Sequence, residues 1–268
     1  GYPDDLSNLS QVMPDVLWSG LVHTPWNHAG DEGFWETLRA QTQALRASTD
    51  RALMVVVGCN LFEWGTFLRR IDNFLMDLVV DTANVERLLD ALLEIHFDTL
   101  DHVIASVGDL VDVLRFGDDL GMDNGPLMSP ATYRAIFKPR HAALNAYVHE
   151  RSTLKTFLHS CGSLYDLMPD IIETGVDILN PVQITARDME PEKLKAEFGD
   201  AITFWGGGAD TRQVLPKGTP DEVRDHVRRN IDTLAPGGGF VFATAHNMLP
   251  DVPPQNIEAM YEAIDEYR

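Results

Sequence analysis

Short apolar runs recur along the chain, and longer segments with helical periodicity separate them. Nearly continuous apolar runs are typical of strands in a parallel sheet, because covered strands have little contact with water. The six clearest predicted strands are residues 53–58, 111–116, 154–158, 176–179, 202–205 and 240–242. Residues 16–22 form a weaker seventh candidate.

The segments between the predicted strands have the pattern of helices. Apolar residues recur at 3.6-residue spacing from Val85 to Val107, which predicts one buried face of a long helix. Thr219, followed three residues later by Glu222, predicts a capping box at a helix start. The last helix is expected to begin at Pro253-Pro254. Its predicted inward side chains are Ile257, Met260, Tyr261 and Ile264.

Strands and helices that alternate without long linkers predict an α/β protein with a parallel sheet. A doubly wound open sheet usually has a G-x-G-x-x-G turn after its first strand. Here residues 206–208 are three glycines followed by Ala209-Asp210, and residues 237–239 precede a predicted strand. We therefore expect one (β/α)8 TIM-type barrel domain over residues 1–268. A closed barrel has eight strands. We therefore expect the N-terminal portion of the domain to be truncated, so that this chain lacks the first one or two strands.

The charge and the cysteine count narrow the function classes. Lys and Arg total 21 against 41 Asp and Glu, giving a net charge of −20. A surface this acidic repels phosphate backbones and anionic lipids, so we expect neither nucleic-acid nor membrane partners. The sequence shows no apolar run long enough for a membrane span and no signal peptide. The only cysteines are Cys59 and Cys161, which exclude a disulfide framework and favour a cytoplasmic location.

The most specific chemical pattern is an H-x-C motif at the end of the third predicted strand. Strand alternation points His159 and Cys161 to the same side, about 7 Å apart along the chain. An imidazole and a thiolate so placed can both reach one zinc ion. His246 follows the last predicted strand, and strand ends converge on one face of a barrel. Three ligands with an open fourth position are typical of catalytic zinc. One alternative is that His159 and Cys161 are two unconnected buried residues. The other is that His246 hydrogen-bonds a loop carbonyl instead of binding zinc.

Other polar residues follow other predicted strands. Asp118 and Asp119 are predicted to be catalytic, by orienting substrate, by providing a fourth ligand or by orienting His159. The competing interpretation is that one of the two caps the following turn. Cys59 is interpreted as a small buried hydrophobe rather than a site residue. The predicted substrate-binding residues are Glu63, Arg115, Asn180, Gln183 and Asp210. His23, Trp26 and His28 are predicted to lie in a surface loop, with a lid or a substrate contact as the alternative.

Five motifs, in order from about residue 50 to the C-terminus, resemble the uroporphyrinogen decarboxylase superfamily. They are Phe116-Gly-Asp-Asp-Leu-Gly, Leu158-His-Ser-Cys-Gly-Ser, Gly175-Val-Asp-Ile-Leu-Asn-Pro-Val-Gln, the Gly-Gly-Gly-Ala-Asp turn, and Ala245-His-Asn before Asp251-Val-Pro-Pro-Gln-Asn. Taken together they are specific for the superfamily and not for one activity in it. The superfamily includes the decarboxylase and cobalamin-dependent methyltransferases, so the resemblance also implies a TIM barrel.

The methyltransferase branch holds zinc through the His and Cys of H-x-C and a later Cys. The resemblance places the first two ligands at His159 and Cys161. The later Cys would fall near His246, where this chain has no Cys. Either His246 replaces it as a nitrogen ligand, which zinc accepts, or the metal is not bound in the family manner. The resemblance also implies a corrinoid, which a partner protein would supply.

We therefore expect a zinc-dependent methyltransferase acting between a corrinoid and a small-molecule or thiol partner. The first alternative is a cofactor-free, uroporphyrinogen decarboxylase-like enzyme acting on a porphyrinogen. That branch has an Arg-rich N-terminal segment and an early Asp, and neither is visible after Gly1. The second alternative is a zinc-storing or ligand-binding barrel. A homodimer is compatible with each of these expectations.

Overall fold

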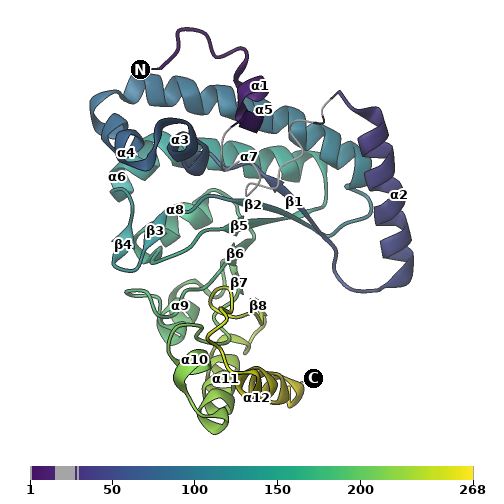
Figure 1. Cartoon of the computed structure of the whole chain (residues 1–268), viewed down its shortest axis with the longest axis vertical. Coiled ribbons are helices and arrows are strands. Elements are labelled where there is room, and N and C mark those ends of the chain that lie inside the picture. Colours follow the sequence, from purple (N-terminus) through teal and green to yellow (C-terminus); the bar gives the residue numbers. More distant parts are fainter. Residues whose placement is uncertain (1, 16–27, 29, 268) are drawn as a thin grey trace. The chain divides into compact units, whose positions relative to one another are not determined.

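The computed structural model describes residues 2–15, 28 and 30–267 (Figure 1). The weak strand candidate at residues 16–22 and the loop residues His23 and Trp26 lie outside the described residues. Among the described residues, no helix combines the length and the apolar character that a membrane span requires.

All six clear strand predictions are confirmed, with ends that differ by at most two residues from those expected. The strands are β1 (Met54–Gly58), β2 (Val113–Gly117), β5 (Lys155–His159), β6 (Ile178–Asn180), β7 (Thr203–Trp205) and β8 (Phe240–Val241). The short strands β3 (Gly121–Met122) and β4 (Gly125–Pro126) pair antiparallel as a small hairpin. The sequence pattern did not predict this hairpin, because two-residue strands are too short to show an apolar period.

The strands of the main sheet follow one another in chain order, β1-β2-β5-β6-β7-β8. The β1–β2, β6–β7 and β7–β8 pairs are parallel, with Met54 opposite Val113, Ile178 opposite Thr203 and Phe204 opposite Phe240. A doubly wound sheet reverses its strand order at a switch point, and this order contains no reversal. The fold is therefore α/β of the TIM-barrel type, with fewer than eight barrel strands among the described residues.

The chain forms two compact units, which are described separately below. Unit 1 comprises Gly1–Asp119, Met128–Leu158 and Glu173–Val176. Unit 2 comprises Leu120–Leu127, His159–Ile172 and Asp177–Arg268. Whether the chain acts as one barrel domain over residues 1–268 stays a prediction.

Unit 1 is rich in helices, and its core is formed largely by the predicted long helix, α5 (Thr82–Val107). Val85, Leu92 and Val107 are fully buried on one face of that helix, as its 3.6-residue period predicts. The other described helical segments are α1 (Leu9–Val12), η1 (Met13–Asp15), α2 (Glu32–Ser48), α3 (Phe62–Arg69), α4 (Ile71–Val80), α6 (Pro130–Thr132), the π-helical turn η4 (Tyr133–Phe137) and α7 (Lys138–Arg151).

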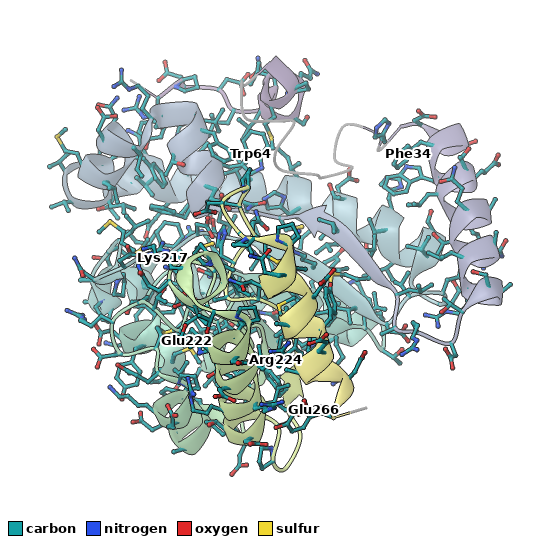
Figure 2. The ribbon with its side chains drawn as sticks, turned by 60° about the horizontal axis from the view of Figure 1, so that its bottom comes forward. Phe34, Trp64, Lys217, Glu222, Arg224 and Glu266 are labelled. Atoms are coloured by element: carbon teal, nitrogen blue, oxygen red, sulfur yellow. The ribbon has the colours of Figure 1, made fainter. Side chains whose placement is uncertain are left out.

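Unit 2 packs two long helices against each other, α11 (Pro220–Leu234) and α12 (Pro254–Asp265), which lie side by side in Figure 2. The predicted capping box is confirmed, because the Thr219 side chain accepts the Glu222 N–H and the Glu222 carboxylate accepts the Thr219 N–H. Ion pairs of 2.8 Å from Arg224 to Glu262 and 2.6 Å from Arg228 to Glu266 join the two helices. The remaining segments are η5 (Tyr165–Leu167), α8 (Met168–Glu173), α9 (Pro191–Phe198) and α10 (Val214–Lys217).

The prediction for the inner face of α12 is partly wrong. Met260 is 2% exposed, and Ile257 and Ile264 pack partly buried against the same core, as expected. Tyr261 is 51% exposed. One residue after Met260 corresponds to a turn of about 100° around the helix, which carries the Tyr261 side chain away from the core.

Candidate metal centre

In unit 2, two of the predicted zinc ligands, His159 and His246, each have a ring nitrogen close to the sulfur of the third, Cys161. His159 is the last residue of β5, and Cys161 follows in the next loop. The Cys161 Sγ lies 3.5 Å from His159 Nε2 and 3.2 Å from His246 Nε2. His159 and Cys161 are half-buried, and His246 is exposed. The structure thus brings both imidazoles to the Cys161 sulfur, and the zinc-ligand roles of the three residues stay predictions.

These separations fit a shared zinc ion. With Zn–S and Zn–N bonds of about 2.3 and 2.05 Å and a tetrahedral angle, sulfur and nitrogen ligands lie about 3.6 Å apart. The two measured sulfur–nitrogen distances, 3.5 and 3.2 Å, are near that value. One thiolate and two imidazoles are also donors that zinc prefers. Each of the two sulfur–nitrogen pairs is therefore spaced as two ligands of one zinc ion would be.

Asn180, predicted to bind substrate, contacts the ring of His159. Its Oδ1 lies 2.7 Å from His159 Nδ1, and its Nδ2 donates a 2.8 Å hydrogen bond to the Trp205 carbonyl. Its backbone carbonyl accepts a 2.6 Å hydrogen bond from the N–H of Ser160. The side chain and the backbone of Asn180 therefore both contact the H-x-C segment.

Gln183, also predicted to bind substrate, supports the loop after Cys161. It is 4% exposed, and its Oε1 accepts a 3.1 Å hydrogen bond from the N–H of Gly162. Its Nε2 donates to the Asp123 carboxylate at 2.9 Å, and the Arg212 guanidinium donates to the same oxygen at 2.7 Å. The amide of Gln183 thus links the Cys161 loop to the β3–β4 hairpin.

Gly162 is a glycine for steric reasons. Its φ is +90°, and a Cβ there would lie 2.4 Å from the backbone carbon of Gly121. The Ser163 N–H also donates a 2.8 Å hydrogen bond to the Met122 carbonyl. The loop that carries Cys161 is therefore held directly against the hairpin backbone.

Asp210 is 6% exposed and stabilises the turn that follows β7. Its Oδ1 accepts hydrogen bonds from the N–H groups of Arg212 at 2.7 Å and Gln213 at 3.2 Å. Its own N–H donates to His226 Nε2 at 3.0 Å, and Asn230 Nδ2 lies 3.1 Å from the same nitrogen. Burial lowers the pKa of His226, which favours the neutral ring that can accept these hydrogen bonds.

In unit 1, Asp118 has a different environment. It is 1% exposed and accepts hydrogen bonds of 2.8–3.2 Å from the backbone N–H groups of residues 61–63, at the start of α3. His141 Nε2 lies 3.0 Å from its Oδ2, and the Tyr133 hydroxyl lies 3.0 Å from His141 Nδ1. The backbone of α3 and the His141 ring thus occupy both oxygens of this carboxylate.

Glu63 lies beside Asp118 in the first turn of α3 and has the most perturbed carboxyl group of the site candidates. Burial, followed by repulsion from Asp118 and Asp119, raises its pKa to about 8, although the Asn60 amide that donates to it acts in the opposite direction. At neutral pH, Glu63 is therefore largely protonated. The carbonyl of Asn60 lies 2.9 Å from the buried His96 Nε2, and burial lowers the pKa of His96 to about 4.

The other candidates of unit 1 have simpler environments. Cys59 is 2% exposed, and burial raises the pKa of its thiol, which confirms its interpretation as a small buried hydrophobe. The Arg115 guanidinium lies 5.9 Å from the centre of the Phe157 ring. Asp119 is half-buried and is the last residue of the first segment of unit 1. The roles predicted for Asp118, Asp119, Glu63 and Arg115 stay predictions.

Sequence reasoning missed Asn60, Asp123 and His141. Each of them bonds a residue that the sequence did single out, namely Glu63, Gln183 and Asp118. His141 lies on the buried face of α7, and a histidine among buried helix positions was a usable signal. Asn60 and Asp123 lie in loops, where no period marks them.

Known proteins resemble this chain in sequence. The methylcobamide:CoM methyltransferase MtaA of Methanosarcina barkeri is 28% identical over 160 residues, which cover 58% of this chain and 42% of MtaA. The uroporphyrinogen decarboxylase of Methylococcus capsulatus is 29% identical over 73 residues, covering 27% of this chain and 20% of that enzyme. The matched regions thus span less than half of each relative.

Structure and family comparisons extend this similarity. A methyltransferase from Methanosarcina mazei superposes with a TM-score of 0.68 at 19% identity, over 99% of this chain and 70% of that one, which supports the fold alone. The family model described as uroporphyrinogen decarboxylase (URO-D) matches residues 55–267, most of the chain. This match covers the strand ends that hold His159, Cys161 and His246. The chain belongs to the uroporphyrinogen decarboxylase family.

Proposed function

We propose that the protein is a zinc-dependent methyltransferase that moves a methyl group between a corrinoid and a thiol or another small molecule. The observation that supports this most directly is the approach of two imidazole nitrogens, at 3.5 and 3.2 Å, to the Cys161 sulfur. The similarity to MtaA, a methylcobamide:CoM methyltransferase, favours the same chemistry. In this proposal the corrinoid is brought by a partner protein.

His159, Cys161 and His246 would hold the metal. When bound, zinc supplies a Lewis acid that lowers the pKa of a coordinated thiol or polarises a methoxy or amine donor. The chain itself keeps the ligands in place, since Gln183 and the β3–β4 hairpin hold the Cys161 loop. The exposure of His246 leaves the centre open to a substrate and to a protein that delivers the methyl group.

Of the remaining candidates, we propose Asp119, Glu63 and Arg115 as substrate contacts. A protonated Glu63 can donate a hydrogen bond or a proton to a substrate, which an ionised carboxylate cannot do. We assign supporting roles to Asp118, Asp210 and Gln183, because their polar atoms already bond the backbone and neighbouring side chains.

Cofactor-free decarboxylation is the second candidate, and the similarity to uroporphyrinogen decarboxylases favours it. A porphyrinogen carries several carboxylates and therefore needs a cationic pocket. The net charge of −20 does not supply such a pocket. Methyl transfer is therefore the first candidate.

Metal content tests the proposal. Elemental analysis of the wild type should find about one zinc per chain, and Cys161→Ala and His246→Ala should each lose it. Cys59→Ala is the matched control, because it removes a buried thiol of unit 1 and should keep the metal. Zinc retained in His246→Ala alone would remove that residue from the site.

A turnover assay separates the two candidate activities. Purified protein is mixed with free methylcobalamin and a thiol, and the loss of the methylcobalamin absorbance is followed. Zinc-dependent demethylation that Cys161→Ala abolishes would support the proposal. A zinc-free wild type that consumes a porphyrinogen would overturn it.

A further inference from the structure

Asn180 is held in a single amide orientation. Its Nδ2 donates to the Trp205 carbonyl at 2.8 Å. A carbonyl oxygen only accepts, so the NH2 group must face Trp205 and the Oδ1 must face His159. Turning the amide over would place two acceptor oxygens against each other. The bond to Trp205 therefore decides which atom the imidazole meets.

That orientation also decides where His159 carries its proton. The Asn180 Oδ1, 2.7 Å from His159 Nδ1, can only accept, so Nδ1 must bear the hydrogen. A neutral imidazole with Nδ1–H has its lone pair on Nε2. Nε2 is the atom that lies 3.5 Å from the Cys161 sulfur. The lone pair thus points toward the proposed position of the metal.

The contacts around this bond limit the movement of the ring. The backbone carbonyl of Asn180 accepts the Ser160 N–H at 2.6 Å, and Gln183 accepts the Gly162 N–H at 3.1 Å. Residues 180–183 thereby hold the chain on both sides of Cys161. A displaced Asn180 side chain would leave the His159 ring without this partner while the backbone around it stays fixed.

We infer that Asn180 is a positioning residue, which fixes His159 as the Nδ1–H tautomer and so presents the Nε2 lone pair beside Cys161. The part of this inference that concerns metal affinity rests on the proposed function. Partners of this kind, when removed, typically change metal affinity by about 10- to 100-fold. The part that concerns the tautomer does not depend on any metal.

Three variants test the inference. Asn180→Leu removes both hydrogen bonds at similar volume, and Asn180→Asp keeps an acceptor for His159 Nδ1. Asn256→Leu is the matched control, because Asn256 is 1% exposed and donates 2.8 Å hydrogen bonds to the carbonyls of Leu215 and Gly218, away from His159 in the sequence. Circular dichroism confirms that each variant folds.

Three measurements are made on each variant. Long-range ¹H–¹⁵N NMR of the metal-free protein reports the tautomer of His159, whose signals are assigned by their loss in His159→Gln. Competition with a chelating dye gives the Zn²⁺ affinity, and the visible spectrum of the Co²⁺-loaded protein reports the ligand geometry.

The expected result is an Nδ1–H tautomer in the wild type that is lost in Asn180→Leu, together with an affinity about 10- to 100-fold weaker. Asn180→Asp should retain the tautomer and most of the affinity, and Asn256→Leu should retain both. An Nε2–H tautomer in the wild type, or an Asn180→Leu protein with unchanged tautomer, would overturn the inference. If the wild type binds no zinc, the proposed function fails, and the tautomer of the variants still decides the role of Asn180.

Discussion

Asp118 in unit 1 and Cys161 in unit 2 each follow a strand, and the sequence predicts both as site residues. In the structure their surroundings differ. Asp118 follows β2 in unit 1 and is buried, with its oxygens bonded to three backbone N–H groups and to His141. Cys161 follows β5 in unit 2 and is half-buried, with its sulfur facing two imidazole nitrogens. A strand-end position alone therefore does not identify a reactive group. The two residues differ in burial and in the observed contacts of their polar atoms, which are backbone N–H groups for Asp118 and imidazole nitrogens for Cys161.

The largest expected effect on stability comes from Asp118. Asp118→Ala leaves the N–H groups of residues 61–63 without their acceptor and should lower the free energy of unfolding by about 3–5 kcal/mol. Asp118→Asn keeps one acceptor oxygen and should lose less. Urea denaturation followed by circular dichroism measures both. A loss below about 1 kcal/mol for the alanine variant would contradict a structural role.

Glu63→Gln should have the next largest effect on the free energy of unfolding, and it should raise that free energy rather than lower it. Its pKa of about 8 in the folded protein lies above its ordinary value of 4.5, so its contribution to stability is fully present below pH 4.5 and is lost as the pH rises to about 8. Glu63→Gln removes this loss and should stabilise the protein at pH 8 by roughly 2–4 kcal/mol. The gain should shrink toward pH 4.5, which urea denaturation at several pH values measures. A gain independent of pH would contradict a raised pKa.

Gln183 tests the support of the Cys161 loop. Gln183→Leu leaves the buried Gly162 N–H without its acceptor and should cost about 1–3 kcal/mol. Arg212→Ala, which removes the half-exposed partner on the other side of Asp123, should cost at most about 1 kcal/mol. Thermal denaturation compares the two variants. Equal losses would show that the whole chain of bonds, rather than the bond to Gly162, supports the loop.

The smallest expected effect on stability belongs to Cys161. Cys161→Ala removes a half-buried sulfur and should change the free energy of unfolding of the metal-free protein by no more than about 0.5 kcal/mol. The same substitution should abolish zinc binding. A loss as large as that of Asp118→Ala would erase the contrast between the two strand ends.

The sequence was sufficient to predict the strands and their succession. The run Met54–Gly58, for example, is apolar over its whole length, which is typical of a strand covered on both faces. The convergence of His159, Cys161 and His246 was also predictable, because parallel strands place their carboxyl ends at one edge. The start of α12 was predicted correctly, and Tyr261 was misplaced because its apolar ring gives no information on which side of the helix it lies.

The partners of the polar residues could not be predicted. Asp118 accepts hydrogen bonds from the N–H groups of Leu61, Phe62 and Glu63, which lie 57, 56 and 55 positions earlier in the chain. No local sequence pattern predicts such contacts. Asn180 appeared to be a substrate contact because it follows a strand, but its bond to His159 spans 21 positions. Such pairings depend on the register of neighbouring strands, which packing determines and local sequence does not encode.

The unequal burial of the two cysteines has a practical consequence. Cys59 is 2% exposed with a thiol pKa above its ordinary value, whereas Cys161 is accessible in part. Thiol-directed reagents react with exposed thiolates and spare buried thiols. A maleimide dye should therefore label the folded chain once, at Cys161, and more slowly when zinc is bound. Without any substitution, the rate of labelling would report the occupancy of the metal centre in real time.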